Sequence, residues 1–364
     1  MTRFRPFSPL IVVGILSLYS RSGEAFPELV RHGYNTCMAC HVSPTGGGML
    51  TPYGRKLAAE LLTTWGSEAS TGVTWGLADQ EKLENALWLG GDIRGAQVHQ
   101  ENTAIRAGRF IKMQASLAAA WVRDAWTVFF ELGKQEGEVW QPYGTSFWGK
   151  YDASENVSLR AGRFVPAYGI HSSDHIAFIR SFTGFGLEAN RDAFETRYAT
   201  ETVSVSLTAS KEPRPSNSEE ALSLAADLSF SEKHLIGLNV LRGDRDGNRR
   251  TLFGIWASLG LSKNAYYLGE FDWQNRDGRS NTASFVTYHR LGYSIVKGLD
   301  VYALYERLES DLASASSSIE RRGPGVQWTP LPHIEISGAW TKQRLNAPNP
   351  MEEDYAWLVL HYWL

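Results

Sequence analysis

Residues 265 to 274 read AYYLGEFDWQ, and their polar and apolar side chains alternate with a period of two. One series carries Tyr267, Phe271 and Trp273, whereas the other carries Glu270 and Asp272. A period of two predicts a β-strand, because successive side chains of a strand point to opposite faces of its sheet. A strand with an aromatic face and a charged face suits a wall between lipid and water.

Sixteen segments of this kind occupy the chain from residue 83 to the end. They begin near Leu87, Ile105, Trp126, Thr145, Val157, Phe194, Val203, Leu222, Leu235, Leu252, Ala265, Ser284, Val301, Gly325, Ile334 and Tyr355. The sequence therefore predicts an all-β fold, a porin-like antiparallel outer-membrane barrel of about sixteen strands over residues 83–364. A soluble β-sandwich is the alternative, but it would not need charged residues opposite an aromatic belt.

The connections between these segments alternate in length. Short turns are expected at Arg123-Asp124, Ser154-Glu155, Ser231-Glu232, Ser262-Lys263 and Pro330-Leu331. Long polar loops are expected at 134–143, 165–191, 210–219, 243–250 and 344–354. Short turns face the periplasm in outer-membrane barrels, so the alternation predicts the orientation.

The composition limits the remaining choices. The formal net charge of -3 and the lack of a basic tail argue against nucleic acid as a partner. Arg3 and Arg5 precede an apolar stretch, and Gly23 to Ala25 supply small residues for cleavage, so residues 1–25 are predicted to be a secretory signal peptide. Beyond this stretch no apolar run approaches the ~18 residues of a membrane-spanning helix.

The chain has two cysteines, and residues 37 to 41 read CMACH. The pattern C-x-x-C-H is the attachment sequence of c-type haem. Cys37 and Cys40 on one turn form thioethers with the porphyrin, and His41 supplies the proximal ligand to the iron. A thioredoxin-like dithiol is the competing interpretation, but no βαβ pattern surrounds the motif. Residues 26–82 are therefore predicted to be a segment that carries one covalent haem c and plugs the barrel.

Two residues are candidates for the second axial ligand of the haem. Met49 follows three glycines that let the chain curl back toward the motif, and a thioether ligand would raise the reduction potential. His32 lies five residues before the motif. The pattern from Gly54 to Trp65 predicts an amphipathic helix that would cover the haem.

Two features of the barrel segments suggest lumen chemistry. The pentapeptide RAGRF occurs at 106–110 and at 160–164, and the parity of the strands predicts that Arg106, Lys112 and Arg160 face the lumen. The loop 165–191 occupies the position of the general-porin loop that folds inward, and this resemblance suggests a constriction. Its residues His171, Asp174 and His175 offer ligands for a divalent metal such as ferrous iron, although a solvated loop is the plainer interpretation.

The C-x-x-C-H motif, the stretch LTPYGR at 50–55 and the following barrel resemble the fused monohaem cytochrome–porins of bacterial outer membranes. The detailed resemblance covers residues 26–62, and some members of that family oxidise ferrous iron outside the cell. It implies an outer-membrane electron conduit of a Gram-negative bacterium, with its haem segment in the lumen or on the periplasmic side.

The partners that this resemblance implies are outer-membrane lipid, periplasmic cytochromes and extracellular ferrous iron, which would make the chain an iron-oxidising oxidoreductase. The alternative is a diffusion porin or transporter whose haem segment is a gate or a sensor.

Overall fold

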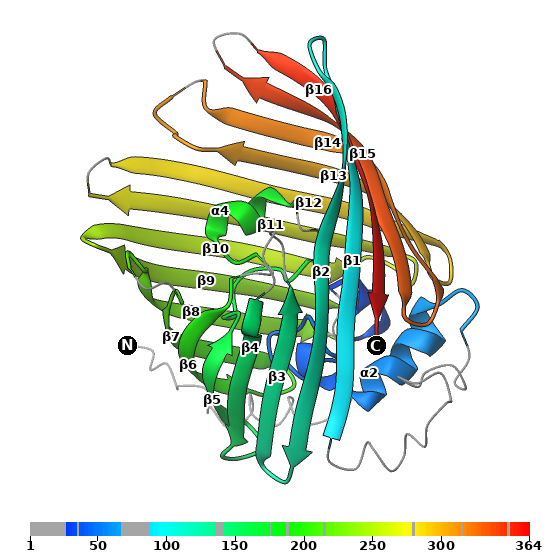
Figure 1. Cartoon of the computed structure of the whole chain (residues 1–364), viewed down its shortest axis with the longest axis vertical. Helices are drawn as coiled ribbons and strands as arrows, with labels where there is room; N and C mark the ends of the chain where they lie inside the picture. Colours follow the sequence, from blue (N-terminus) through cyan, green and yellow to red (C-terminus); the bar gives the residue numbers. More distant parts are fainter. Residues whose placement is uncertain are drawn as a thin grey trace, which may run out of the picture.

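The computed structural model describes residues 27–34, 36–66, 87–134, 141–172, 174, 176–186, 189–213, 216–278, 281–314, 316–347 and 350–364. The predicted signal peptide lies outside the described residues. Sixteen antiparallel strands form a closed barrel in which β1 pairs with β16, which confirms the predicted fold (Figure 1). The strands are β1 Leu87–Glu101, β2 Arg106–Arg123, β3 Trp126–Lys134, β4 Gln141–Asp152, β5 Val157–Phe164, β6 Arg191–Ala199, β7 Val203–Lys211, β8 Glu220–Ser231, β9 His234–Arg245, β10 Asn248–Gly260, β11 Ala265–Asp277, β12 Thr282–Val296, β13 Leu299–Glu309, β14 Ser318–Leu331, β15 Ile334–Asn346 and β16 Met351–Trp363.

The two faces of the wall follow the alternation in the sequence. On β3, Val128 and Phe130 are exposed, whereas Thr127, Phe129 and Glu131 are buried. On β11 the inward series from Tyr266 to Gln274 is buried throughout. The outer surface is therefore apolar and aromatic, and the polar groups gather inside.

Two connections differ from the prediction. The long loop expected at 243–250 is absent, because β9 and β10 continue to a two-residue turn of Asp246 and Gly247. Both turn residues have positive φ, 49° and 79°, which matches the right-handed twist of a tight hairpin. The turn expected at Pro330-Leu331 lies two residues later, where His333 has φ 71°.

A bulge reverses the parity of β2. Arg94 pairs with Gln114 and Gly95 pairs with Lys112, so Met113 is an extra residue on β2. Beyond it the side chains change face: Met113 is buried, whereas Lys112 and Arg106 are exposed. The prediction that Arg106 and Lys112 face the lumen is therefore wrong, and the same prediction for Arg160 is confirmed, since Arg160 is 1% exposed.

Residues 27–66, here called the plug, fill the short-turn end of the barrel. The plug contains η1 (Pro27–His32), η2 (Cys37–Ala39), α2 (Pro52–Leu57) and the π-helical turn η3 (Ala58–Leu62), and η1 contacts β9, β10 and β11. Arg31 forms an ion pair with Asp300 at 3.3 Å. The N–H groups of Thr64 and Trp65 donate to carbonyls of β14, so the plug is joined to the wall at both ends.

Residues 165–190, here called the inward loop, enter the lumen from the other side, which confirms the predicted constriction. Their helix α4 (Phe178–Thr183) contacts β11, β12 and β13, across the barrel from the strands that the loop connects (Figure 1). Phe178 and Ile179 pack with Tyr266, Leu268 and Tyr288 of that wall. Among the described residues, no helix is long and apolar enough to cross a membrane.

Candidate cofactor cavity inside the barrel

The C-x-x-C-H motif forms one tight turn inside the plug. Residues Cys37 to Ala39 are a 3-10 helix, and the N–H of His41 donates to the carbonyl of Cys37 at 3.0 Å. The two cysteines are not joined by a disulfide. The turn therefore offers two thiols and an imidazole at the spacing that covalent haem attachment needs.

A hairpin brings the chain back along this turn. The N–H of Val42 donates to Met49 at 3.1 Å, and that of Thr51 donates to Cys40 at 2.8 Å. The hairpin closes through Gly46, Gly47 and Gly48, whose φ angles are 80°, 75° and 61°. Only glycine adopts such a run without strain. A Cβ on Gly46 would lie 3.3 Å from the Cys37 sulfur, so the backbone itself covers the thiol.

A cavity of about 560 Å³ lies between the plug, the wall and the inward loop. Its size falls within the ~300–1,000 Å³ that cofactor sites span. Cys37 and His41 line it, together with apolar residues such as Phe129, Trp148 and Phe164. The basic lining residues suit the two carboxylates of a haem; they are Arg94, Arg180, Arg197 and Arg290.

Cys40 occupies a different environment from Cys37. It is 2% exposed and packs with Leu29, Leu50 and Leu57 in the core of the plug, and it does not line the cavity. A thioether at Cys40 therefore requires its side chain to turn about χ1 toward the cavity. With that rotation, the donor set of the motif and the lining of the cavity fit a covalently held haem.

The two sequence candidates for the second ligand lie in different places. Met49 lines the cavity, is 3% exposed, and packs with Phe129 and Trp148 of the wall. His32 is exposed and is absent from the cavity lining. The helix expected over Gly54 to Trp65 forms as α2 and η3, but it packs on the core of the plug around Leu29 and Cys40. It therefore does not cover the cavity.

The structure separates the proposed metal ligands of the inward loop. His171 lines the large cavity, whereas Asp174 lines a smaller one beside Arg290. His175 lies outside the described residues. Within the described part of the chain no three His, Cys, Asp or Glu side chains are grouped as a metal site would require. Among the described residues His171 and Asp174 are therefore not brought together, and a site that includes His175 lies outside them.

Burial shifts two ionisable groups that line the cavity. It raises the pKa of the Cys37 thiol to about 11, so that this thiol is protonated at neutral pH. Burial also lowers the pKa of His171 to about 3, with smaller contributions from Arg180, Arg160 and His41. His171 is therefore a neutral imidazole at neutral pH.

The cavity side of the inward loop is attached to the opposite wall. The hydroxyl of Tyr168 donates to Asp272 at 2.9 Å, and the N–H of Ile170 donates to Glu270 at 2.6 Å. Gly169 between them has φ 60°, and a Cβ there would lie 2.0 Å from a Glu270 oxygen. The wall therefore fixes residues 168–170 directly beside His171.

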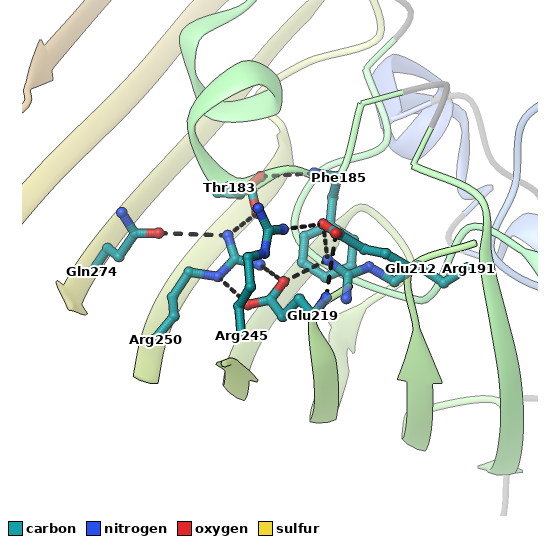
Figure 2. A network of polar contacts seen from close by, with 8 residues as sticks. All are labelled: Thr183, Phe185, Arg191, Glu212, Glu219, Arg245, Arg250 and Gln274. Atoms are coloured by element: carbon teal, nitrogen blue, oxygen red, sulfur yellow. Dashed lines mark hydrogen bonds and ion pairs between the residues drawn. The ribbon is translucent and has the colours of Figure 1, made fainter. Parts of the chain in front are cut away.

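A network of charged groups holds the other end of the loop (Figure 2). Arg250 donates to Glu219 at 2.7 and 2.8 Å and to the carbonyl of Thr183 at 2.8 Å. Arg191 binds the same Glu219 at 2.8 Å and lies over the ring of Phe185. This network joins the loop to β6, β8 and β10, so the constriction is fixed in place.

Sequence reasoning missed a cluster of acids and a histidine beside the cavity. His361 binds Asp92 at 2.7 Å through Nε2 and Glu335 at 3.2 Å through Nδ1. Sequence parity alone does not bring Asp92 to His361, because β1 and β16 meet only through closure of the barrel. Arg160 was identified as inward, but its ion pair with Glu195 at 2.9 Å and its hydrogen bond to Ser43 of the plug were not.

The closed barrel with an inward loop defines the fold class as that of the sixteen-stranded porins. OprB of Pseudomonas putida is similar over 84% of this chain and 99% of its own, with a TM-score of 0.61 and 10% identity. The outer membrane channel DcaP of Acinetobacter baumannii covers 76% of this chain and 97% of its own, with a TM-score of 0.56 and 13% identity. An anion-selective porin from Comamonas acidovorans covers 77% and 99%, with a TM-score of 0.59 and 9% identity. No protein-family model and no curated protein matches the sequence.

Proposed function

We propose that this chain is an outer-membrane cytochrome–porin. In this proposal it is exported through its signal peptide and holds one haem c through Cys37 and Cys40, with His41 as the proximal ligand. It passes electrons between an extracellular partner and periplasmic cytochromes. The observation that carries the proposal is the position of the C-x-x-C-H turn inside the barrel, with Cys37 and His41 on a cavity of cofactor size.

The bound haem would supply one-electron redox chemistry, which no side chain of the cavity provides. The plug and the inward loop fill the lumen from both ends, and Thr45 of the plug bonds the carbonyl of Val165 in the loop at 3.4 Å. Their contact restricts the flow of solutes. The basic lining residues Arg94 and Arg197 would hold carboxylates of the cofactor, and the aromatic residues would exclude water.

The cavity extends to the short-turn rim of the barrel. Residues Glu155 and Asn156 of one turn and 199–203 of the next line it there. Short turns face the periplasm in barrels of this kind, so a periplasmic electron carrier would reach the cofactor from this side. The extracellular partner would act from the side of the inward loop.

Ferrous iron is the candidate for that extracellular partner, and with it an iron-oxidising activity. The described residues of the inward loop group no three metal ligands.

A diffusion porin whose plug acts as a gate or sensor is the second candidate, and the likeness to OprB and to the anion-selective porin favours it. The two functions differ in proteoliposomes that hold an electron acceptor and a labelled sugar inside. A conduit reduces the acceptor with an external reductant and retains the sugar, and the variant C37A/C40A loses the reduction. Release of the sugar without electron transfer would establish the porin instead.

A further inference from the structure

His171 of the inward loop has a buried ring nitrogen that the protein leaves without a partner. Its Nε2 atom is fully buried and forms no hydrogen bond within the described part of the chain. A buried polar atom without a partner is costly and needs an explanation, such as a water, an ion or a bound group. Because His171 lines the same cavity as His41, the cofactor is a direct candidate for that partner.

Three described histidines line the cavity, and they differ in the state of their ring nitrogens. His41 belongs to the attachment motif. His361 already uses Nε2 with Asp92 and Nδ1 with Glu335, so no nitrogen is left to bind a metal. His171 is therefore the cavity histidine suited to a second ligand.

Met49 lies on the same hairpin as His41. It pairs with Val42, the residue after His41, and His41 itself pairs with Leu50. A second haem ligand would approach the iron from the side opposite His41. His171 belongs to a different segment from His41, and β11 across the barrel holds the neighbouring residues of that segment. Met49 instead packs against the wall, with its Cγ beside Gly90.

The loop also fixes the backbone on both sides of His171. The N–H of Ser172 donates to Ile170 at 2.8 Å, which places His171 at the centre of a three-residue turn. Glu270 holds Ile170 on one side of the turn, and Arg180 donates to the carbonyl of Ser172 on the other. Ligands held in this way by neighbouring hydrogen bonds bind a metal with little reorganisation.

We propose that His171 is the second axial ligand of the haem, so that the iron is held between imidazoles of the plug and of the inward loop. This inference rests on the proposed function. In this proposal the inward loop has a chemical role as well as a structural one, because it would close the cavity by binding the iron.

The test uses the full-length protein with attached haem and the variants H171A, H171M, H361Q and M49L. We expect the wild type to be low-spin, with an electron paramagnetic resonance signal of two imidazole ligands. H171A becomes high-spin, binds carbon monoxide when reduced, and returns to low-spin when imidazole is added. H171M stays low-spin with a raised reduction potential, because a Met/His pair favours the reduced state. H361Q is the matched cavity-histidine control, and both it and M49L keep the wild-type spectrum.

An unchanged spectrum in H171A would overturn the inference and assign the buried nitrogen to a water. A high-spin spectrum in M49L alone would overturn it in favour of Met49. Both outcomes leave the proposed function intact, because the haem is still attached. Absence of covalent haem from the wild type would instead overturn the proposed function together with this inference. Imidazole rescue in H171A excludes a merely misfolded variant.

Discussion

The plug and the inward loop fill the same lumen from opposite ends, but the wall holds them in different ways. The plug is attached largely through main-chain groups and through Arg31, with its ion pair to Asp300. The loop is attached through Glu270, Glu306 and Arg250 of distant strands. A local motif therefore indicates the chemistry of the plug, whereas the place of the loop depends on contacts between residues 67 to 128 positions apart in the sequence.

The largest expected effect breaks the chemistry of the plug and leaves the wall untouched. The double variant C37A/C40A should lose all covalent haem, because both thioethers are gone, and should still form a heat-modifiable barrel, since neither cysteine lies in a strand. Peroxidase staining of gels measures the first property, and the shift in mobility on heating measures the second. Staining that persists in the double variant would contradict the attachment.

The next effect releases the loop. Glu306 accepts the N–H of Phe178 at 2.7 Å, and Glu270 accepts that of Ile170. The variant E270A/E306A leaves two buried N–H groups without acceptors, at a cost of ~1–3 kcal/mol each. We expect the single-channel conductance in planar bilayers to rise several-fold.

The matched control for this release is E220A/E320A, which removes two carboxylates that the inward loop does not use. It should leave the conductance close to that of the wild type. A similar rise in both variants would show that lost negative charge, and not the loop, sets the conductance.

The repeated pentapeptide supplies a smaller and better matched comparison. Arg160 and Glu195 form an ion pair in which both side chains are 1% exposed, and Arg160 also reaches the plug. Arg163 binds Asp192 at 2.8 Å on the exposed face. R160A should lower the free energy of unfolding by ~3–5 kcal/mol, because it leaves the buried carboxylate of Glu195 without its cationic partner. R163A should lower it by less than ~1 kcal/mol.

Unfolding by guanidinium in detergent measures both members of this pair. Equal losses in the two variants would mean that the lumen around Arg160 is well hydrated.

The smallest effect concerns the hairpin of the plug. A Cβ on Gly47 would have no atom within 4 Å. G47A should therefore lower the stability of the hairpin by ~1–2 kcal/mol, the cost of a left-handed backbone at a residue other than glycine. G46A adds a contact with the Cys37 sulfur and should lower the fraction of protein that carries haem as well. Limited proteolysis of the plug and the ratio of haem to protein measure the two effects. Equal haem content in both variants would show that Gly46 does not cover the thiol.

The sequence predicts the wall of the barrel well, because inward and outward side chains alternate along each strand with a period of two. All sixteen segments correspond to strands, and the parity fails where Met113 forms a bulge, which no local pattern of β2 reveals. The turn at Asp246-Gly247 was not predicted, because the ends of β9 and β10 beyond the apolar band consist of polar residues and resemble a loop.

The cavity was predictable only in part. The motif identifies Cys37, Cys40 and His41. Which other histidine has a ring nitrogen available to bind the iron depends on contacts across the barrel. His171 and His361 both line the cavity, yet Asp92 and Glu335 engage the ring of His361, whereas Nε2 of His171 has no partner among the described residues. The contact of His361 with Asp92 arises from closure of the sheet, which follows from no single stretch of the chain.

The seam of the barrel bears on the order of events during biogenesis. β1 pairs with β16, and the N–H of Leu364 donates to Gly91 at 2.8 Å, so this pairing closes the wall. Cys37 then faces a cavity inside the barrel. An attachment enzyme is far too large to enter that space, so under the proposed function haem would have to be joined to the chain while the seam is still open. Attachment of the cofactor would then precede closure of the barrel, and a chain that closed early would remain without haem.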